Sequence, residues 1–366
     1  MPMGANPFTP TFGSVPPELA GRAQLIKDIL EGLENGPGDP NRASIFVGPR
    51  GSGKTALLAA IAEQAEEMGW ISVNVTAREG MLDEIMVQTR EKGSHLIRPE
   101  ASSHVTGVQI RGVGLSREMV DRRSTWRSEM TAILRELNDA GTGLLITVDE
   151  AASSSEELYT LVDVFQHFVR EHRNVALLLA GLPHNVSLLL DDDGISFLRR
   201  AFRHSMEAID DNDVADAIKE TVENAGRSID PKALALAARG AGGFAFLIQL
   251  IGYHMWRQHP NEERVTLEDV ENALALAKHD MERMVLEPTV RSLTPREMDY
   301  LLAMTQDGSV SQVSSIAERM GVAPNNASKV RKRLVERGII GPRGRGRVAF
   351  EVPMLKEYLL ERAGEL

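Results

Sequence analysis

The sequence predicts an α/β fold in which helices cover both faces of a parallel sheet, followed by two mainly helical domains. Up to about residue 210, short apolar runs of β type alternate with amphipathic helical stretches, as in a doubly wound sheet. Beyond Asp211 helical periodicity replaces these runs. From Thr294, three short helical stretches precede a glycine-broken ribbon. We therefore expect three domains, at residues 1–210, 211–290 and 291–366.

Composition excludes several classes of protein. The 366 residues include no cysteine, which excludes thiolate metal sites and thiol nucleophiles. The N-terminus has no basic segment followed by an apolar one, and no apolar run reaches the roughly 20 residues that a membrane-spanning helix needs. We expect a cytoplasmic protein that does not enter a membrane.

The first strand leads into a loop with a phosphate-binding pattern. Residues 45–47 form an apolar run, and the next nine residues are Gly48, Pro49, Arg50, Gly51, Ser52, Gly53, Lys54, Thr55 and Ala56. The glycines let the loop turn its backbone N–H groups toward phosphate oxygens, Lys54 adds a positive charge near the β and γ phosphates, and the Thr55 hydroxyl is a ligand for Mg²⁺. Apolar residues from Leu57 to Met68 share one face of a helix, whose N-terminus favours the same anion. We predict that all nine residues bind a nucleotide.

The alternation of strands and helices continues after this helix. Residues 70–75 read as a strand, 79–91 as a helix and 124–140 as a second helix. The stretch Val105–Leu115 is rich in glycine and β-branched residues, and there we expect a hairpin beside the sheet.

A near-continuous apolar run, Leu144–Val148, ends in two acids, Asp149 and Glu150. Such a run suits a strand that is covered on both faces, and we expect it to lie beside the strand that precedes the phosphate-binding loop. Asp149 would hold Mg²⁺, and Glu150 would orient or deprotonate the attacking water. The alternative is that two acids merely end a strand.

The remaining helical and strand segments complete the first two domains. An amphipathic helix at 158–169 and a buried strand at 175–180 close the α/β domain. Four helical segments follow, near residues 213–225, 231–239, 243–256 and 267–285.

The C-terminal domain has the element order of a winged helix-turn-helix. Thr294 and Glu297 form a capping box, with Pro295 in the first helical position. Short helices are expected at 295–304, 313–320 and 324–336, before the ribbon at 341–350.

Positive charge is concentrated in this domain, although the whole chain has a net charge of −11. Residues 321–350 contain eight basic residues and one acid, a net charge of +7, so the rest of the chain carries −18. Ala327, Val330 and Leu334 are spaced to face inward. The expected DNA contacts are Asn325, Asn326, Lys329, Lys332 and Arg333 on the last helix, and Arg343, Arg345 and Arg347 on the ribbon, where a two-residue period would put all three on one face.

Together these segments resemble a known family. Gly48–Thr55 resembles a Walker A motif and Leu144–Glu150 a Walker B motif. With a helical lid and a winged helix behind them, the chain resembles AAA+ P-loop ATPases, most of all the origin-recognition initiator-like and STAND-like ATPases. The resemblance implies a P-loop NTPase sheet, binding of ATP or ADP with Mg²⁺, and ATP hydrolysis. It leaves a nucleotide-dependent homo-oligomer open.

The resemblance also implies roles for residues outside the two motifs. In the family a hydrophobic-Gly-Arg element contacts the adenine end, so Gly21 and Arg22 are assigned to nucleotide binding; a helix start with an exposed arginine is the alternative. An arginine near the end of the core stabilises the γ-phosphate, often from a neighbouring subunit. Arg199, Arg200 and Arg203 are candidates, of which Arg200 is favoured as catalytic, against an exposed basic helix end.

Two departures from the family predict slow hydrolysis. Ala180–Pro183 places no polar residue at the end of the fourth strand, and Gly242–Phe246 in the lid contains no arginine.

We therefore expect a slowly hydrolysing ATPase that acts as a nucleotide-gated switch on double-stranded DNA through its winged helix. The alternative is a STAND-like signalling ATPase whose winged helix docks on its own lid or on a protein partner. A small-molecule phosphotransferase fits less well, because no acceptor pocket is recognisable after the core.

Overall fold

The computed structural model describes residues 5–11, 14–98 and 115–362. The chain packs into two compact units. Arg22–Val47 and Lys54–Ser205 form the α/β unit, whereas the segment up to Gly21, the loop Gly48–Gly53 and the chain from Met206 onward form the second. The hairpin expected at Val105–Leu115 falls outside the described residues, except for Leu115, which begins a helix.

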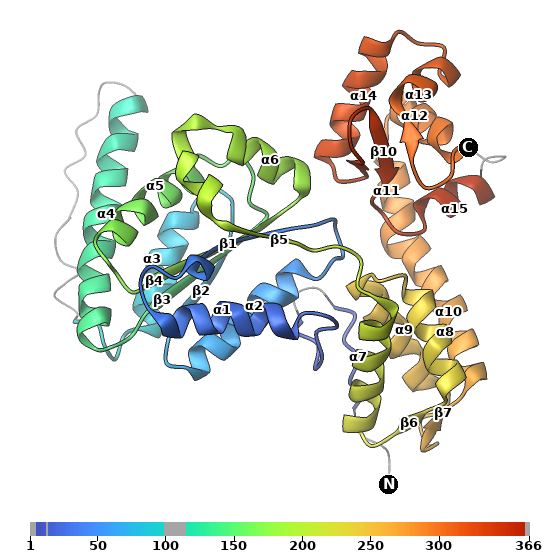
Figure 1. Cartoon of the computed structure of the whole chain (residues 1–366), viewed down its shortest axis with the longest axis horizontal. Coiled ribbons are helices and arrows are strands. Elements are labelled where there is room, and N and C mark those ends of the chain that lie inside the picture. Colours follow the sequence, from blue (N-terminus) through green and yellow to red (C-terminus); the bar gives the residue numbers. More distant parts are fainter. Residues whose placement is uncertain (1–4, 12–13, 99–114, 363–366) are drawn as a thin grey trace. The chain divides into compact units, whose positions relative to one another are not determined.

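The α/β unit is built on a parallel sheet of five strands (Figure 1). The strand order is β2-β3-β4-β1-β5. The bounds are β1 Ala43–Val47, β2 Ile71–Thr76, β3 Leu144–Asp149, β4 Val175–Gly181 and β5 Phe202–Ser205. All seven residues of β4 are buried, as expected for a central parallel strand that is covered on both faces.

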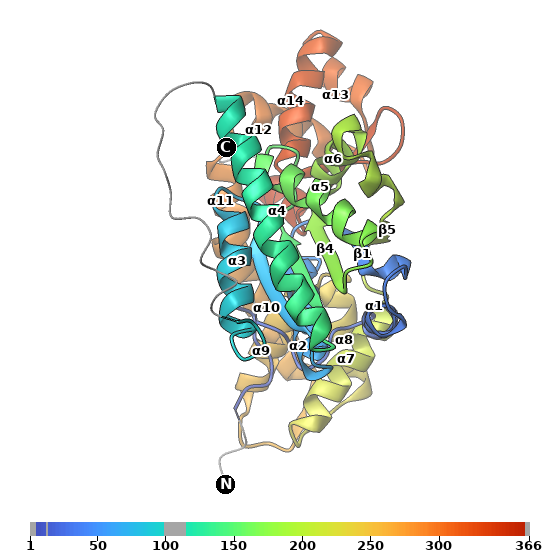
Figure 2. The same ribbon diagram turned by 90° about the vertical axis from the view of Figure 1, so that its left-hand side faces the viewer.

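Helices cover both faces of this sheet, as the sequence predicts. On one face α1 packs on α2, and α2 packs on β2, β3 and β4. On the other face the cores of α3, α4, α5 and α6 form one cluster with alternate sheet residues, such as Val73, Ile146 and Leu177 (Figures 1 and 2). The bounds are α1 Ala23–Asn35, α2 Lys54–Glu67, α3 Met81–Lys92, α4 Leu115–Asp139, α5 Glu156–Arg170 and α6 Pro183–Asp191, with 3-10 helices at Pro40–Arg42 and Asp193–Arg200.

The second unit contains four helices that we call the lid helices. They are α7 Asp211–Asn224, α8 Pro231–Ala241, α9 Ala245–Gln258 and α10 Leu267–Met281, with a short parallel pair of strands, β6 Ser228–Ile229 and β7 Arg264–Val265. The chain continues from α10 through a π-helical turn, Glu282–Leu286, into α11, Glu287–Arg291. Among the described residues, no helix is long and apolar enough to cross a membrane.

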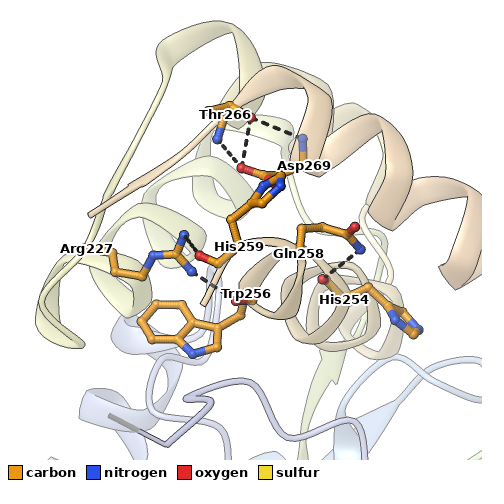
Figure 3. A network of polar contacts seen from close by, with 7 residues as sticks. All are labelled: Arg227, His254, Trp256, Gln258, His259, Thr266 and Asp269. Atoms are coloured by element: carbon orange, nitrogen blue, oxygen red, sulfur yellow. Dashed lines mark hydrogen bonds and ion pairs between the residues drawn. The ribbon is translucent and has the colours of Figure 1, made fainter. Parts of the chain in front are cut away.

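A polar network closes one end of the lid helices (Figure 3). Asp269 is wholly buried and accepts hydrogen bonds from Thr266, whose N–H and Oγ1 lie 2.7 and 2.9 Å away, and it pairs with His259 Nδ1 at 2.5 Å. Burial by itself would raise the pKa of Asp269, but these hydrogen bonds outweigh it, so the pKa lies below its ordinary value. Arg227 stacks on Trp256 and donates to the carbonyls of Trp256 and His259.

The C-terminal segment has the predicted element order of a winged helix-turn-helix. Its bounds are α12 Pro295–Thr305, β8 Ser311–Gln312, α13 Val313–Arg319, α14 Pro324–Glu336, β9 Ile340–Pro342, β10 Arg347–Phe350 and α15 Leu355–Glu361. The three strands form an antiparallel sheet in the order β8-β10-β9. The capping box of Thr294 and Glu297 is present at the start of α12, as the sequence predicts.

The C-terminal segment packs directly on the helix that leads out of the lid helices. Both share one continuous core of buried residues. At the surface, Lys278 Nζ lies 2.7 Å from Glu361 Oε1, and Arg362 Nη2 lies 3.6 Å from Glu287 Oε1. The lid helices and the C-terminal segment lie in one compact unit. The domain boundary predicted at residue 290 stays a prediction.

Candidate nucleotide and nucleic-acid sites

The predicted phosphate-binding loop connects β1 to α2. Gly51 and Gly53 have φ angles of 77° and 86°, a region in which glycine carries no steric penalty. Ser52 Oγ donates to Pro49 O at 2.9 Å and so braces the loop from within. Gly48 has no room for a side chain, because a Cβ there would lie 2.6 Å from Met206 Cβ. Lys54, Thr55 and Ala56 form the first turn of α2.

Thr55 and Asp149, the two residues predicted to hold Mg²⁺, lie together. Thr55 Oγ1 donates to Asp149 Oδ2 at 2.5 Å. Hydroxyl and carboxylate oxygens are the hard ligands that Mg²⁺ prefers, so the donor set fits this ion. Both residues belong to the α/β unit.

The expected neighbour of β3 is wrong. We placed the strand that ends in Asp149 beside the strand of the phosphate-binding loop, but β4 lies between them. Thr55 still reaches Asp149 because α2 runs across the sheet and packs on β2, β3 and β4. The helix, not strand adjacency, brings the two motifs together.

Glu150 follows β3 in a strained conformation. Its φ is 55°, a left-handed value that few non-glycine residues adopt. Its N–H donates to Asp149 Oδ1 at 2.8 Å, and its side chain is exposed. The next residue, Ala151, donates its N–H to Ala180 O at 2.8 Å. The ends of β3 and β4 are therefore tied together, with the Glu150 carboxylate left on the surface.

At the end of β4, Gly181 allows the close approach to the segment after β3, and no polar side chain is present there. A Cβ at Gly181 would lie 2.7 Å from Ala151 O, so glycine is required there. The sequence departure at Ala180–Pro183 thus has a packing reason.

Gly21 and Arg22 lie where the chain passes from one unit to the other. Gly21 has a φ of 63°, and a Cβ on it would lie 2.8 Å from Asp213 Oδ2 at the start of α7. Arg22 is the N-cap residue of α1. The sequence did not reveal that the segment before them docks on α9, where Phe8 is buried over Gly252.

The three candidate arginines differ in their surroundings. Arg199 donates from Nε to Leu190 O at 2.8 Å and from Nη2 to Asp191 O at 3.3 Å, so it caps the end of α6. Arg200 is exposed at the end of the 3-10 helix Asp193–Arg200, and Arg203 is exposed on the edge strand β5. Arg200 and Arg203 thus remain candidates for contact with a γ-phosphate.

Helix α14 has the two faces that the sequence predicts. Ala327, Val330 and Leu334 are buried. The predicted contact residues are all exposed, namely Asn325, Asn326, Lys329, Lys332 and Arg333. Lys332 Nζ lies 3.8 Å from Glu336 Oε1, a weak surface pair.

The expected two-residue period on the wing is wrong. Residues 343–346 form a turn, in which Gly344 and Gly346 have φ angles of 86° and 70°. Arg343 is held by Glu351, with its Nη1 2.6 Å from Oε1. Arg345 lies in the turn and Arg347 begins β10, and both are exposed. Positive φ at the two glycines breaks the strand alternation that the sequence pattern suggested.

Comparison with known proteins gives two family matches. Residues 38–190 match a family described as an AAA domain, and residues 283–359 match one described as a domain of unknown function. No curated protein matches the chain in sequence.

Solved structures of similar fold span nearly the whole chain. The Cdc6p structure from Pyrobaculum aerophilum has a TM-score of 0.50 and 17% identity, covering 97% of this chain and 96% of that one. The ORC2 protein of Aeropyrum pernix, in an ADP form, has a TM-score of 0.55 and 18% identity, with the same coverage. At this identity the likeness concerns the fold. Residues 38–190 therefore match an AAA domain, and the fold of the whole chain is similar to that of these two proteins.

Proposed function

We propose that this chain is a slowly hydrolysing ATPase whose nucleotide state gates the binding of double-stranded DNA by its winged helix. The main support for nucleotide binding is the hydrogen bond between Thr55 and Asp149. It brings the ends of both Walker motifs to one point in the α/β unit.

ATP would be held by the loop residues 48–53 and by Lys54, Thr55 and Ala56. Thr55 and Asp149 would hold Mg²⁺, which neutralises phosphate charge when bound. Glu150 carries the carboxylate that orients or deprotonates the attacking water. Its exposed side chain and strained backbone suit a group that is held for chemistry instead of packing. Arg200 would reach a γ-phosphate, in this chain or in a neighbouring copy.

The DNA part rests on the exposed polar and basic face of α14. Asparagine can bridge adenine edges, and lysine or arginine can bond guanine edges, in the major groove. Arg345 and Arg347 on the wing would contact the sugar-phosphate backbone. Arg343 contributes less, because Glu351 already pairs with it.

A charge-reversal experiment tests the DNA part. We expect Lys329→Glu to weaken binding of a labelled mixed-sequence duplex at least about tenfold in fluorescence anisotropy, because it replaces an attraction to phosphate by a repulsion. Lys232→Glu on α8 is the control, since Lys232 is also exposed and the change in net charge is the same. Equal loss in both variants would show a general charge effect, and no loss in Lys329→Glu would remove α14 from the interface.

One observation favours the signalling alternative. The C-terminal segment already packs on the end of α10 and on α11, through a shared core and through the Lys278–Glu361 and Arg362–Glu287 pairs. In that case its exposed basic face would meet a protein. If the protein bound no duplex without nucleotide, with ADP or with ATP, the signalling function would be favoured over DNA binding.

A further inference from the structure

The phosphate-binding loop packs against the start of α9, within the second unit. Phe246 N–H donates to Gly51 O at 3.4 Å. Ala245 Cβ lies so close to Gly53 that a Cβ on that glycine would be 3.1 Å away. Two of the loop's glycines therefore touch two consecutive residues of α9.

The start of α9 is itself held in place. Gly242 and Gly243 turn the chain between α8 and α9 with φ angles of 55° and 74°. Gly243 O accepts a hydrogen bond from Ile209 N at 2.9 Å, and a Cβ on Gly243 would lie 2.5 Å from Ile209 O. Met206, three residues earlier, packs on Gly48. Neighbouring parts of the same unit thus contact the loop at Gly48 and at Gly51–Gly53.

The bond to Gly51 O determines where the next N–H points. In a planar trans peptide the C=O and the following N–H point in opposite directions. Because Gly51 O faces α9, the Ser52 N–H points away from α9. A phosphate-binding loop works by directing such N–H groups at phosphate oxygens.

We propose that the first turn of α9 is a positioning element for nucleotide binding, in which Phe246 N–H and the small side chain of Ala245 hold the loop in its phosphate-binding conformation. This deepens the proposed function and rests on it. Helix α9 contributes Leu247, Ile248 and Ile251 to the core that continues into the C-terminal segment. The phosphate loop and the proposed DNA-binding face therefore belong to one unit.

A matched pair of substitutions at one position tests the backbone bond. Phe246→Ala and Phe246→Pro both remove the ring, but only proline removes the N–H, and the first turn of a helix tolerates it. We expect Phe246→Pro to bind fluorescent N-methylanthraniloyl-ADP and its ATP counterpart about fivefold more weakly than Phe246→Ala, the loss of one net hydrogen bond. Equal dissociation constants in the two folded variants would overturn the proposal.

A second pair guards against misfolding of the proline variant. Ala245→Leu adds bulk against Gly53, whereas Ala275→Leu makes the same change on an exposed position of α10. We expect nucleotide affinity to fall at least about tenfold in Ala245→Leu alone, because the added bulk displaces the loop. The thermal midpoint without nucleotide checks that both variants are folded. Equal affinities would overturn the proposal. If the wild type itself bound neither nucleotide, the proposed function would fail instead.

Discussion

Gly252 lies in the middle of α9, and its missing side chain leaves the space that Phe8 fills. A Cβ built on Gly252 would lie 2.1 Å from Phe8 Cδ1 and 2.4 Å from Cε1. The Phe8 ring is only 2% exposed and belongs to the core of the second unit. Asn6 Nδ2 donates to Tyr253 O at 3.0 Å, and Thr9 N donates to Gln249 Oε1 at 3.0 Å. These bonds fasten the segment on both sides of the ring.

Because the Phe8 ring fills the space that a side chain at Gly252 would occupy, the effect of Gly252→Ala on stability should depend on the residue at position 8. Phe8→Ala should cost about 3–5 kcal/mol, because it empties a buried aromatic site. Gly252→Ala should cost about 1–3 kcal/mol in the wild type, because the ring must move. With Phe8 already removed, the new methyl enters free space, and Gly252→Ala should instead stabilise the helix by about 0.5–1 kcal/mol. The coupling between the two positions is therefore about 1.5–4 kcal/mol.

Urea unfolding of the wild type, both single variants and the double variant measures this coupling. The free energies of unfolding should show that Gly252→Ala changes sign with the residue at position 8. If it destabilises both backgrounds equally, Phe8 does not occupy the space above Gly252, and the docking of the N-terminal segment on α9 is refuted.

Substitutions at Lys54, Glu150 and Asp269 test the two motifs and the lid core. Lys54→Ala should weaken ATP and ADP binding at least about tenfold in a fluorescence titration, because it removes a charged phosphate contact; an unchanged affinity would place the phosphates elsewhere. Glu150→Gln should keep ATP affinity while single-turnover hydrolysis falls on the order of 10²-fold, and a wild-type rate would remove Glu150 from the chemistry. Asp269→Asn should cost about 2 kcal/mol. Because the folded pKa of Asp269 is lowered, its contribution is complete above the unfolded pKa of about 3.9 and is lost as the pH falls through the folded pKa. The stability difference should therefore shrink as the pH falls from about 5 through the folded pKa, and a difference that grew on acidification would contradict this.

Local patterns account for the features that the sequence predicts correctly. The glycine-rich loop between β1 and α2 and the capping box at Thr294 are each defined by a few consecutive residues whose backbone roles follow from residue type. The faces of α14 follow from the spacing of Ala327, Val330 and Leu334.

The order of strands in the sheet depends on contacts between distant segments, which the spacing of residues in the sequence does not reveal. The run 144–148 is apolar except for Thr147, and the run 175–180 is apolar throughout, so either could lie next to β1. The edge strand β5 escaped prediction because Phe202–Ser205 has no apolar alternation, and only one of its four residues is even partly buried.

Tertiary packing explains the remaining differences. Phe8 is one of two phenylalanines in a proline-rich stretch, and nothing local indicates that Gly252, far along the chain, makes room for it. On the wing, the Arg-Gly alternation looks like a strand, but the positive φ angles of Gly344 and Gly346 turn it into a tight connection.

The central claim is that nucleotide state gates DNA binding, and one measurement tests it most directly. A labelled mixed-sequence duplex is titrated with the protein without nucleotide, with ADP and with ATP and Mg²⁺, across a salt series, for the wild type and Lys54→Ala. We predict different duplex affinities in the ADP and ATP states, no such difference in Lys54→Ala, and a slope of log affinity against log salt of about −5 if six phosphates are contacted. Equal affinities in all nucleotide states would contradict the gating, and a flat salt response would contradict DNA as the partner.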